Sequence, residues 1–208
     1  MVKTSETFDE TLAKIRSRKA VVGVIGLGYV GLPLVVTCAS RGYPTIGFDV
    51  DQKKVEQLDR NESYIDAVSS EALAAVAGTS RYTADFSLIA ECDVVVICVP
   101  TPLTKYREPD LSYVEMTGRA VSENMSSGTL VVLESTTFPG TTSEVLQPIL
   151  AQSNLTPNQD FWVAFSPERE DPGNAKYRTA TIPKIVGADT PQARDLVAAF
   201  YGNVVDAV

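Results

Sequence analysis

The chain alternates short apolar runs with segments of helical periodicity. The apolar runs lie at residues 20–26, 44–50, 93–100, 129–136, 161–167, 184–188 and, more weakly, 203–208. They show no strict alternation, which is typical of parallel strands covered on both faces. Helices are predicted between them, at about residues 30–41, 51–59, 69–77, 111–125, 141–151 and 190–201, with a further helix near residues 5–18. This order predicts an α/β fold, a Rossmann-type doubly wound parallel sheet.

Two of the predicted helices begin with capping signals. Ser112 and Glu115 have the spacing of a capping box, and Thr190 followed by Pro191 predicts an N-cap with a proline in the first turn. No internal repeat or linker divides the sequence. We therefore expect an N-terminal helical extension over residues 1–19 and one Rossmann domain over residues 20–208.

Composition narrows the class of partner. The chain of 208 residues is 44% apolar and 21% charged, as in a globular protein with a sizeable core. Its net charge of −8 disfavours nucleic acid and an anionic membrane surface, because both require a basic face. No apolar run is long enough to span a membrane, and residues 1–19 lack the apolar core of a signal peptide. We therefore expect a cytoplasmic protein.

The residue types exclude several kinds of site. The sequence contains no histidine, which excludes Ser-His triads, Cys-His dyads and histidine metal sites, and we predict no metal. The three cysteines, Cys38, Cys92 and Cys98, form no CxxC pair. Cys38 lies in the apolar stretch of the predicted helix at 30–41, and Cys92 and Cys98 belong to the predicted strand before "VPTP". In such surroundings a cysteine is more often a small buried side chain than a nucleophile.

A glycine motif follows the first apolar run. Gly26, Gly28 and Gly31 form G-x-G-x-x-G between a predicted strand and a predicted helix. Such glycines permit a tight turn, the approach of a pyrophosphate to the backbone, and close packing of helix on strand. Asp49 ends the second run, 18 residues after Gly31, where a carboxylate binds ribose hydroxyls and repels a 2′-phosphate. The motif therefore predicts NAD as cofactor in preference to NADP.

Other interpretations of this motif remain open. The same glycines occur in flavin-binding and SAM-binding proteins, in dinucleotide-binding modules without catalysis, and in turns that bind nothing. The fingerprint of β-hydroxyacid dehydrogenases, GxxGLGxMG, is also close, although Tyr29 and Val30 replace its methionine pattern here.

Polar residues follow three further runs, as "VPTP" at 99–102, "ESTT" at 134–137 and "SPERE" at 166–170. Because ligands of open α/β sheets bind beyond the carboxyl ends of the strands, we expect these segments to converge on the cofactor. Each has a simpler alternative. Thr136 could cap the helix that starts near Thr141, and Glu168 could be a solvated acid in a turn.

Four segments together resemble the UDP-glucose/GDP-mannose dehydrogenase family: "GVIGLGYVGLPL", "VPTPL" with "PDLSYV", "LESTTFPGTT" and "FSPEREDPGN". The last is most similar to members that act on UDP-N-acetylhexosamines such as UDP-N-acetylglucosamine. "RNESYIDAV" at 60–68 also resembles a loop of this family. The resemblance covers the sequence from about residue 10 onward.

The resemblance implies an activity and a set of site residues. Family members oxidise the C6 alcohol of a nucleotide sugar to the acid with two NAD, through a thiohemiacetal and a thioester on a cysteine. The implied cofactor-binding residues are Gly26, Gly28, Tyr29, Val30, Gly31, Asp49, Lys54, Pro100, Thr101, Ser135 and Thr136. Glu168 would be the catalytic acid and base, with Thr136 placing the water. The residues implied to cover the UDP-sugar are Arg169, Glu170, Asp171, Pro172, Gly173 and Asn174.

One part of the family pattern lies beyond this sequence. The catalytic cysteine of the family belongs to a later GGxC segment in a second domain, and the sequence ends at Val208 before it. We therefore expect the NAD-binding half of a nucleotide-sugar dehydrogenase, which binds NAD and does not oxidise sugar alone. UDP-N-acetylglucosamine is the favoured substrate, and the full-length enzyme is expected to form a homodimer or a larger assembly. A UDP-glucose 6-dehydrogenase and a stand-alone dinucleotide-binding module remain the alternatives.

Overall fold

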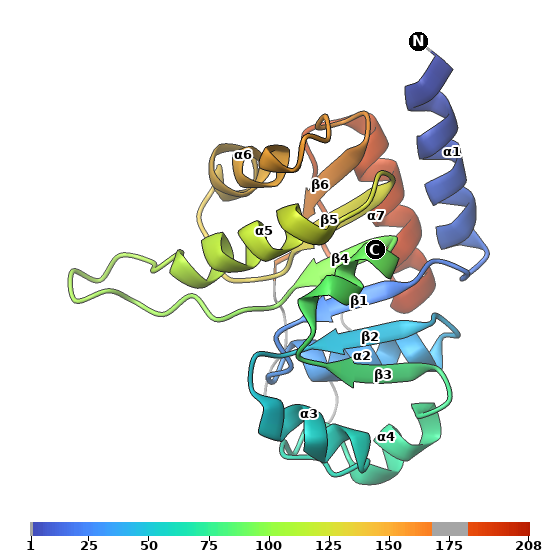
Figure 1. Cartoon of the computed structure of the whole chain (residues 1–208), viewed down its shortest axis with the longest axis vertical. Coiled ribbons are helices and arrows are strands. Elements are labelled where there is room, and N and C mark those ends of the chain that lie inside the picture. The colour runs from blue at the N-terminus through green and yellow to red at the C-terminus, as the bar shows by residue number, and fades with distance from the viewer. Residues whose placement is uncertain (1, 168–182) are drawn as a thin grey trace.

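A six-stranded parallel sheet forms the centre of the molecule (Figure 1). The computed structural model describes residues 2–167 and 183–208. Within them the strands are β1 (Val22–Ile25), β2 (Thr45–Phe48), β3 (Ser80–Thr83), β4 (Val94–Ile97), β5 (Thr129–Leu133) and β6 (Phe161–Phe165). Their order in the sheet is β3-β2-β1-β4-β5-β6, and every neighbouring pair is parallel. After β3 the chain returns to the middle of the sheet and places β4 on the other side of β1. The predicted Rossmann-type sheet is therefore confirmed.

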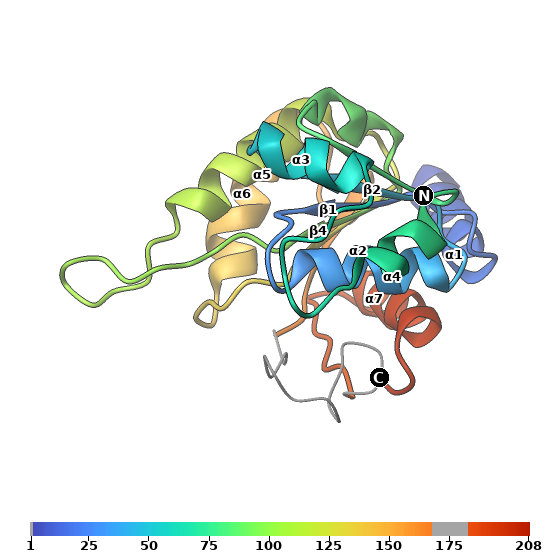
Figure 2. The ribbon, with the colours of Figure 1, turned by 90° about the horizontal axis from the view of Figure 1, so that it is seen from below.

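Helices connect the strands and cover both faces of the sheet. They are α1 (Val2–Arg16), α2 (Gly31–Ser40), α3 (Gln52–Asp59), α4 (Ser70–Val76), α5 (Ser112–Asn124), α6 (Gln147–Leu150) and α7 (Pro191–Val204). The 3₁₀ helices η1 (Phe86–Glu91) and η3 (Ala151–Ser153) and the π-helix η2 (Thr141–Leu146) complete the helical segments of the described residues. Figure 2 shows α5 on one side of the sheet and α2, α4 and α7 on the other. Each predicted helix is present, and the one predicted at 141–151 consists of η2, α6 and the start of η3.

The strands supply side chains to two cores, one on each face. Val22 and Val24 of β1 pack in the core beneath α2 and α7, whereas Ile25 packs in the core beneath α5. Val94 and Val95 of β4 divide between the same two cores. Every residue of a central strand therefore faces apolar neighbours, which explains the uninterrupted apolar runs in the sequence.

Two of the predicted strands are wrong, and one strand was not predicted. Residues 184–188 form no strand and contribute a single antiparallel bridge, between Gly187 and Phe165. Residues 203 and 204 belong to the last turn of α7, and residues 205–208 form no strand. The strand that was not predicted is β3 at one edge of the sheet, whose sequence, Ser-Arg-Tyr-Thr, is polar and partly exposed. An edge strand is held by backbone hydrogen bonds on one side only, so its sequence need not be apolar.

The two predicted helix starts have different outcomes. The capping box at Ser112 and Glu115 is wrong, since α5 starts after Leu111 without a side-chain cap, and Asp110 Oδ1 accepts a hydrogen bond from the Ser112 amide at 2.9 Å. At α7 the prediction is confirmed. Thr190 Oγ1 accepts a hydrogen bond from the Ala193 amide at 3.3 Å, and Pro191 is the first helical residue.

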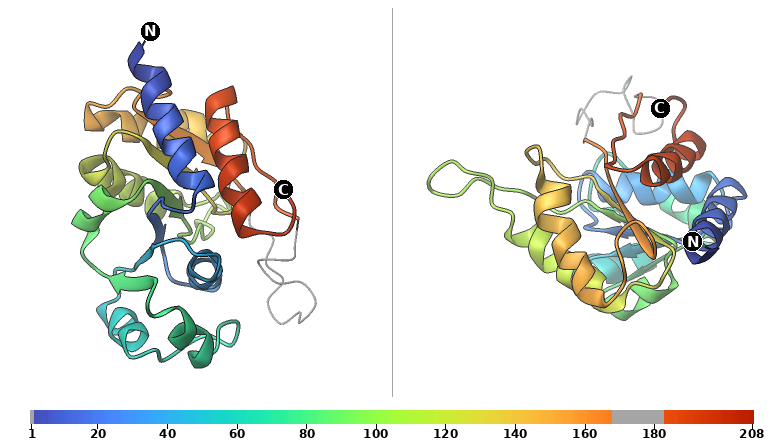
Figure 3. Two further views of the ribbon diagram at one scale, coloured as in Figure 1. Left: turned by 90° about the vertical axis from the view of Figure 1, so that its right-hand side faces the viewer. Right: turned by 90° about the horizontal axis from the view of Figure 1, so that it is seen from above.

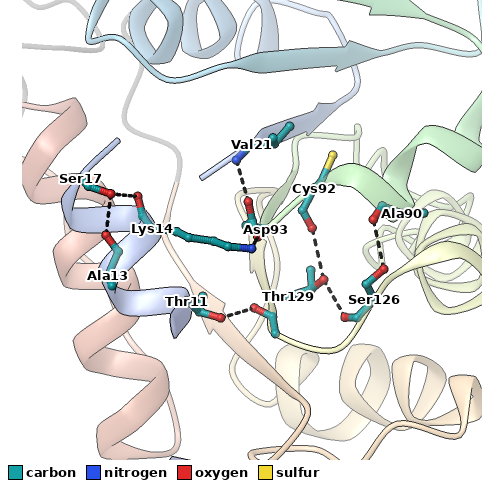
Figure 4. A network of polar contacts seen from close by, with 11 residues as sticks. Thr11, Ala13, Lys14, Ser17, Val21, Ala90, Cys92, Asp93, Ser126 and Thr129 are labelled. Carbon is teal, nitrogen blue, oxygen red and sulfur yellow. Dashed lines mark hydrogen bonds and ion pairs between the residues drawn. The ribbon is translucent and has the colours of Figure 1, made fainter. Parts of the chain in front are cut away.

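The N-terminal helix α1 lies beside α7 on the outside of the sheet (Figure 3). Its Lys14 ammonium pairs with Asp93 at 2.7 Å, and the other Asp93 carboxylate oxygen accepts from the Val21 amide at 2.9 Å (Figure 4). The Thr11 hydroxyl donates to the Gly128 carbonyl at 2.9 Å. These contacts join α1 to the loops that precede β1, β4 and β5. The division of the chain at residue 20 stays a prediction.

No helix among residues 2–167 and 183–208 is long and apolar enough to cross a membrane.

Candidate functional site

A cavity of about 710 Å³ opens at the carboxyl edge of the sheet, where β1, β2, β4 and β5 end. Pockets of this size commonly hold small molecules and cofactors. The predicted cofactor residues that line it are Gly26, Gly28, Tyr29, Val30, Asp49, Lys54, Pro100, Thr101, Ser135 and Thr136. Gly31, the remaining predicted cofactor residue, is buried at the start of α2. The topology therefore brings together residues that lie far apart in the sequence.

The three glycines of the loop after β1 have different surroundings. Gly26 has a φ of +93°, and a Cβ added there would lie 2.7 Å from the Cys98 carbonyl oxygen. A Cβ added to Gly31 would lie 1.9 Å from the Gly26 carbonyl oxygen. A Cβ added to Gly28 meets no protein atom within 4 Å, although Gly28 lines the cavity. Gly26 and Gly31 are therefore needed for the local fold, whereas the open space at Gly28 suits the approach of a ligand.

Asp49 closes one end of the cavity, directly after β2. One carboxylate oxygen accepts from the Leu27 amide at 2.9 Å and from the Lys54 ammonium at 3.2 Å. The other accepts from the Asp51 amide at 3.0 Å. These bonds fix the carboxylate against the glycine loop, at the place where a Rossmann sheet binds the adenosine ribose.

The loops after β4 and β5 close the opposite end. The Thr101 hydroxyl donates to the Thr136 carbonyl at 2.6 Å, and the Ser135 hydroxyl donates to the Val99 carbonyl at 2.7 Å. The two loops are therefore joined to each other across the carboxyl edge. The alternative in which Thr136 caps the next helix is wrong, since η2 begins after Gly140 without a side-chain cap.

The third polar segment, after β6, is described only in part. The buried Ser166 donates its hydroxyl to the Ile185 carbonyl at 3.0 Å, and its amide bonds to Leu133 at 3.0 Å. Glu168 and the predicted substrate segment, Arg169 to Asn174, lie outside the described residues.

Several residues of the site were not predicted from the sequence. The Tyr64 hydroxyl donates to the Leu27 carbonyl of the glycine loop at 2.6 Å, and Lys54 Nζ lies 5.8 Å from the centre of its ring. The only sign in the sequence that Tyr64 contacts the glycine loop was its position in "RNESYIDAV". Phe86, Tyr113 and Met116 form an apolar wall, and Glu134 also lines the cavity. Only the three-dimensional structure brings the three apolar residues to the site, whereas Glu134 begins "ESTT", a segment that the sequence predicts there.

The cysteines match the interpretation as small buried side chains. Cys38, Cys92 and Cys98 are all buried, and none of the three is in a disulfide. Burial raises the pKa of the Cys38 thiol well above its usual range, and it raises that of Cys92 to about 12. Cys38 and Cys92 therefore stay protonated at neutral pH, whereas a nucleophilic cysteine reacts as the thiolate.

The donors and the open space fit a dinucleotide. Asp49 at one end can accept hydrogen bonds from ribose hydroxyls, and the glycine loop in the middle offers the space at Gly28 and the N-terminus of α2 to phosphates. The loops of Thr101 and Thr136 border the other end.

Comparison with known proteins places this chain in a family. Residues 20–205 match the NAD binding domain of the UDP-glucose/GDP-mannose dehydrogenase family. The UDP-N-acetyl-D-glucosamine 6-dehydrogenase of Salmonella typhi is 38% identical over 187 residues, which are 89% of this chain and 44% of that protein. The UDP-N-acetyl-D-mannosamine dehydrogenase of Pyrococcus horikoshii is 34% identical, over 88% of this chain and 44% of that protein. The chain thus spans less than half the length of these relatives.

A solved structure shows the same architecture. The NDP-N-acetyl-D-galactosaminuronic acid dehydrogenase of Methanosarcina mazei Go1 superimposes with a TM-score of 0.83 at 31% identity, over 94% of this chain and 45% of that chain. Among the alternatives that the glycine motif left open, these matches decide against a β-hydroxyacid dehydrogenase.

Proposed function

Since the chain belongs to the UDP-glucose/GDP-mannose dehydrogenase family and is its NAD-binding domain, we propose that it serves a nucleotide-sugar 6-dehydrogenase. The reaction is the oxidation of the C6 alcohol of a UDP-N-acetylhexosamine to the uronic acid. This four-electron oxidation consumes two NAD per sugar, each of which accepts one hydride, and one water supplies the second oxygen of the acid. The chain's own residues bind and orient the dinucleotide and shape the end of the cavity where the sugar would meet it.

One observation carries the proposal for the cofactor site. At Gly28 the backbone faces the cavity, and a Cβ added there would meet no protein atom within 4 Å, while Asp49 lies at the end of the neighbouring strand β2. We assign the pyrophosphate to the loop of Gly26, Gly28 and Gly31 and the adenosine ribose to Asp49. Lys54 is assigned to the adenosine side, since it pairs with Asp49 at 3.2 Å.

The roles at the other end follow from the loops after β4 and β5. Thr101 and Thr136 are assigned to the nicotinamide side, and the bond between the Thr101 hydroxyl and the Thr136 carbonyl holds them together. Ser135 uses its hydroxyl within the protein, so its part is to shape the wall. Glu168 is proposed as the acid and base of the reaction, and Arg169 to Asn174 as the cover of the UDP-sugar.

We propose UDP-N-acetylglucosamine as the substrate in preference to other sugars. The Salmonella typhi relative named for this sugar is 38% identical, and the mannosamine enzyme of Pyrococcus horikoshii is 34% identical. This difference in identity is small, so UDP-N-acetylmannosamine and UDP-glucose must be tested as substrates beside UDP-N-acetylglucosamine.

The chain alone is proposed to bind NAD without oxidising sugar. A cysteine that forms a thiohemiacetal must be accessible and ionisable, and Cys38 and Cys92 are buried with raised pKa values. Cys98 borders the cavity but is 9% exposed.

An absorbance assay for NADH formation tests this division. The chain is incubated with NAD and, in turn, UDP-N-acetylglucosamine, UDP-N-acetylmannosamine and UDP-glucose, with a full-length relative as the positive control. We expect NADH from the relative and none from the chain. NADH formation by the chain with any of the sugars would contradict the proposal. Equilibrium binding of NADH to the same preparation shows that a negative result does not come from unfolded protein.

A further inference from the structure

A buried charged cluster lies behind the wall of the cavity, next to Thr136. Glu134, which follows β5, is 2% exposed and lines the cavity. One of its carboxylate oxygens pairs with the Lys184 ammonium, and the other accepts a hydrogen bond from the Tyr201 hydroxyl of α7. Lys184 and Tyr201 are also buried. Burying two charges costs several kcal/mol before their attraction is counted, so such a cluster needs an explanation.

Only one of the three residues of the cluster lines the cavity. Glu134 borders the cavity, whereas neither Lys184 nor Tyr201 is among its lining residues. Lys184 lies on the far side, where its Nζ is 5.4 Å from the centre of the Tyr201 ring and its amide donates to the Ala207 carbonyl at 2.9 Å. The acidic residue of the cluster therefore borders the cavity, whereas the basic residue contacts α7 and the C-terminal segment.

The position of Glu134 fixes which end of the dinucleotide it would face. With the adenosine ribose at Asp49 and the pyrophosphate at Gly28, the nicotinamide extends over the ends of β4 and β5. Glu134 directly precedes Ser135 and Thr136 at the end of β5. Glu134 is thus assigned to the nicotinamide side of the cavity, and Asp49 to the adenosine side.

The electrostatic effect of such a carboxylate differs between the two forms of the cofactor. The nicotinamide ring carries a positive charge in oxidised NAD and none in NADH. A carboxylate in a site of low dielectric stabilises a nearby cation much more than a neutral ring. The field of Glu134 reaches its neighbours, since burial and this carboxylate raise the pKa of Tyr201 well above its usual range.

We propose that Glu134 is a specificity-determining residue that makes the site favour oxidised NAD over NADH, with Lys184 behind it limiting the size of this preference. The inference rests on the proposed function, because it requires the dinucleotide to occupy the cavity in the stated direction. Favouring the oxidised form suits a dehydrogenase, which binds oxidised NAD and releases NADH.

A simpler alternative is that the cluster only joins β5 to α7 and the segment after residue 182. In that case its loss would weaken both forms of the cofactor equally. The dissociation constant for oxidised NAD divided by that for NADH separates the two explanations, since a purely structural role does not change this ratio.

Calorimetric titrations of the chain with oxidised NAD and with NADH test the proposal. Glu134→Gln removes the carboxylate and leaves the Lys184 charge uncompensated, so we expect the ratio of the two constants to rise about fivefold or more. The double variant Glu134→Gln/Lys184→Gln should raise it less, because both charges are gone. Tyr201→Phe is the control, since it removes a hydroxyl and no charge, and its ratio should stay at the wild-type value.

An unchanged ratio in a folded Glu134→Gln variant would overturn the inference. If circular dichroism shows that this variant does not fold, the double variant, which removes both charges of the Glu134–Lys184 pair, decides in the same way. Wild-type chain that binds neither dinucleotide would contradict the proposed function itself, and the inference would fall with it. Wild-type binding with an unchanged ratio in the variants would overturn the inference alone.

Discussion

At the scale of single residues, the glycines of the loop after β1 differ in whether the fold or a ligand requires them. Gly28 and Gly31 belong to the same motif, but a Cβ at Gly31 would collide with the Gly26 carbonyl, whereas a Cβ at Gly28 would enter the open cavity. The motif predicts that Gly28 admits a pyrophosphate and that Gly31 allows close packing of the helix on the strand. The surroundings of the two glycines in the structure agree with these different reasons.

Gly28→Ala should therefore weaken NADH binding strongly while leaving the melting temperature close to that of the wild type. The added methyl group occupies space that the pyrophosphate needs and touches no protein atom. Gly78→Ala is the matched control, because its added Cβ also meets nothing within 4 Å and Gly78 does not line the cavity. Calorimetry and thermal unfolding measure the two effects. Wild-type affinity in Gly28→Ala would place the pyrophosphate elsewhere.

Asp49→Asn should weaken NADH binding about tenfold or more, since hydrogen bonds to a charged group are worth about 1.5–3 kcal/mol. It should also narrow the difference between NADH and NADPH, because the repulsion of a 2′-phosphate is lost. Asp206→Asn is the control, because Asp206 forms a surface ion pair with Arg41. Titrations with both dinucleotides measure the effect. An unchanged preference would show that Asp49 does not contact the ribose.

The residues of the site were predictable to different degrees. Gly26, Gly28 and Asp49 follow from spacing alone, because the motif lies within one strand–helix–strand unit. The cluster of Glu134, Lys184 and Tyr201 could not be predicted in this way. Lys184 and Tyr201 lie 50 and 67 positions after Glu134 and meet it only in the folded chain. A charged residue at the end of an apolar strand, as in "LESTT", is the one sign that the sequence offers.

At the scale of elements, burial decides which predictions hold. The central strands were found because both faces are covered, and that requirement makes their sequences apolar. β3 was missed because an edge strand with a polar sequence has no such requirement. Residues 184–188 were mistaken for a strand because they are apolar, although part of this segment, Lys184, belongs to the buried cluster instead.

The helix α1 offers a test at this scale. Thr11→Val keeps the shape of the side chain and removes the hydroxyl that donates to the Gly128 carbonyl at 2.9 Å. We expect the free energy of unfolding to fall by about 1 kcal/mol, which is typical of one lost hydrogen bond. Ser17→Ala is the control, because its hydroxyl bonds within α1 and is exposed. Urea unfolding measures both variants. Equal effects would mean that α1 does not depend on this contact with the loop before β5.

At the scale of the whole molecule, several buried groups have raised pKa values. Cys38, Cys92 and Tyr201 are among these groups, and desolvation is the first cause for each. Each keeps its proton to a higher pH in the folded chain than in the unfolded chain. The unfolded chain therefore loses protons first as the pH rises above the ordinary values of 9.0 for cysteine and 10.0 for tyrosine.

The free energy of unfolding should consequently be steady near neutral pH and fall as the pH rises above about 9. Urea unfolding between pH about 7 and about 11 measures this change. Tyr201→Phe should lessen the fall, whereas Tyr106→Phe, at an exposed position, should leave it unchanged. A stability that stays constant to the alkaline end would contradict the burial of these groups.

The central claim concerns the molecule as a whole: the chain folds and binds NAD by itself, in the cavity at the carboxyl edge of the sheet. The most direct test is a calorimetric titration of the chain with NADH and, in parallel, with NADPH. The account predicts binding of NADH with one molecule per chain and much weaker binding of NADPH, since Asp49 lies at the ribose. Failure to bind NADH, in a preparation that circular dichroism shows to be folded, would contradict it.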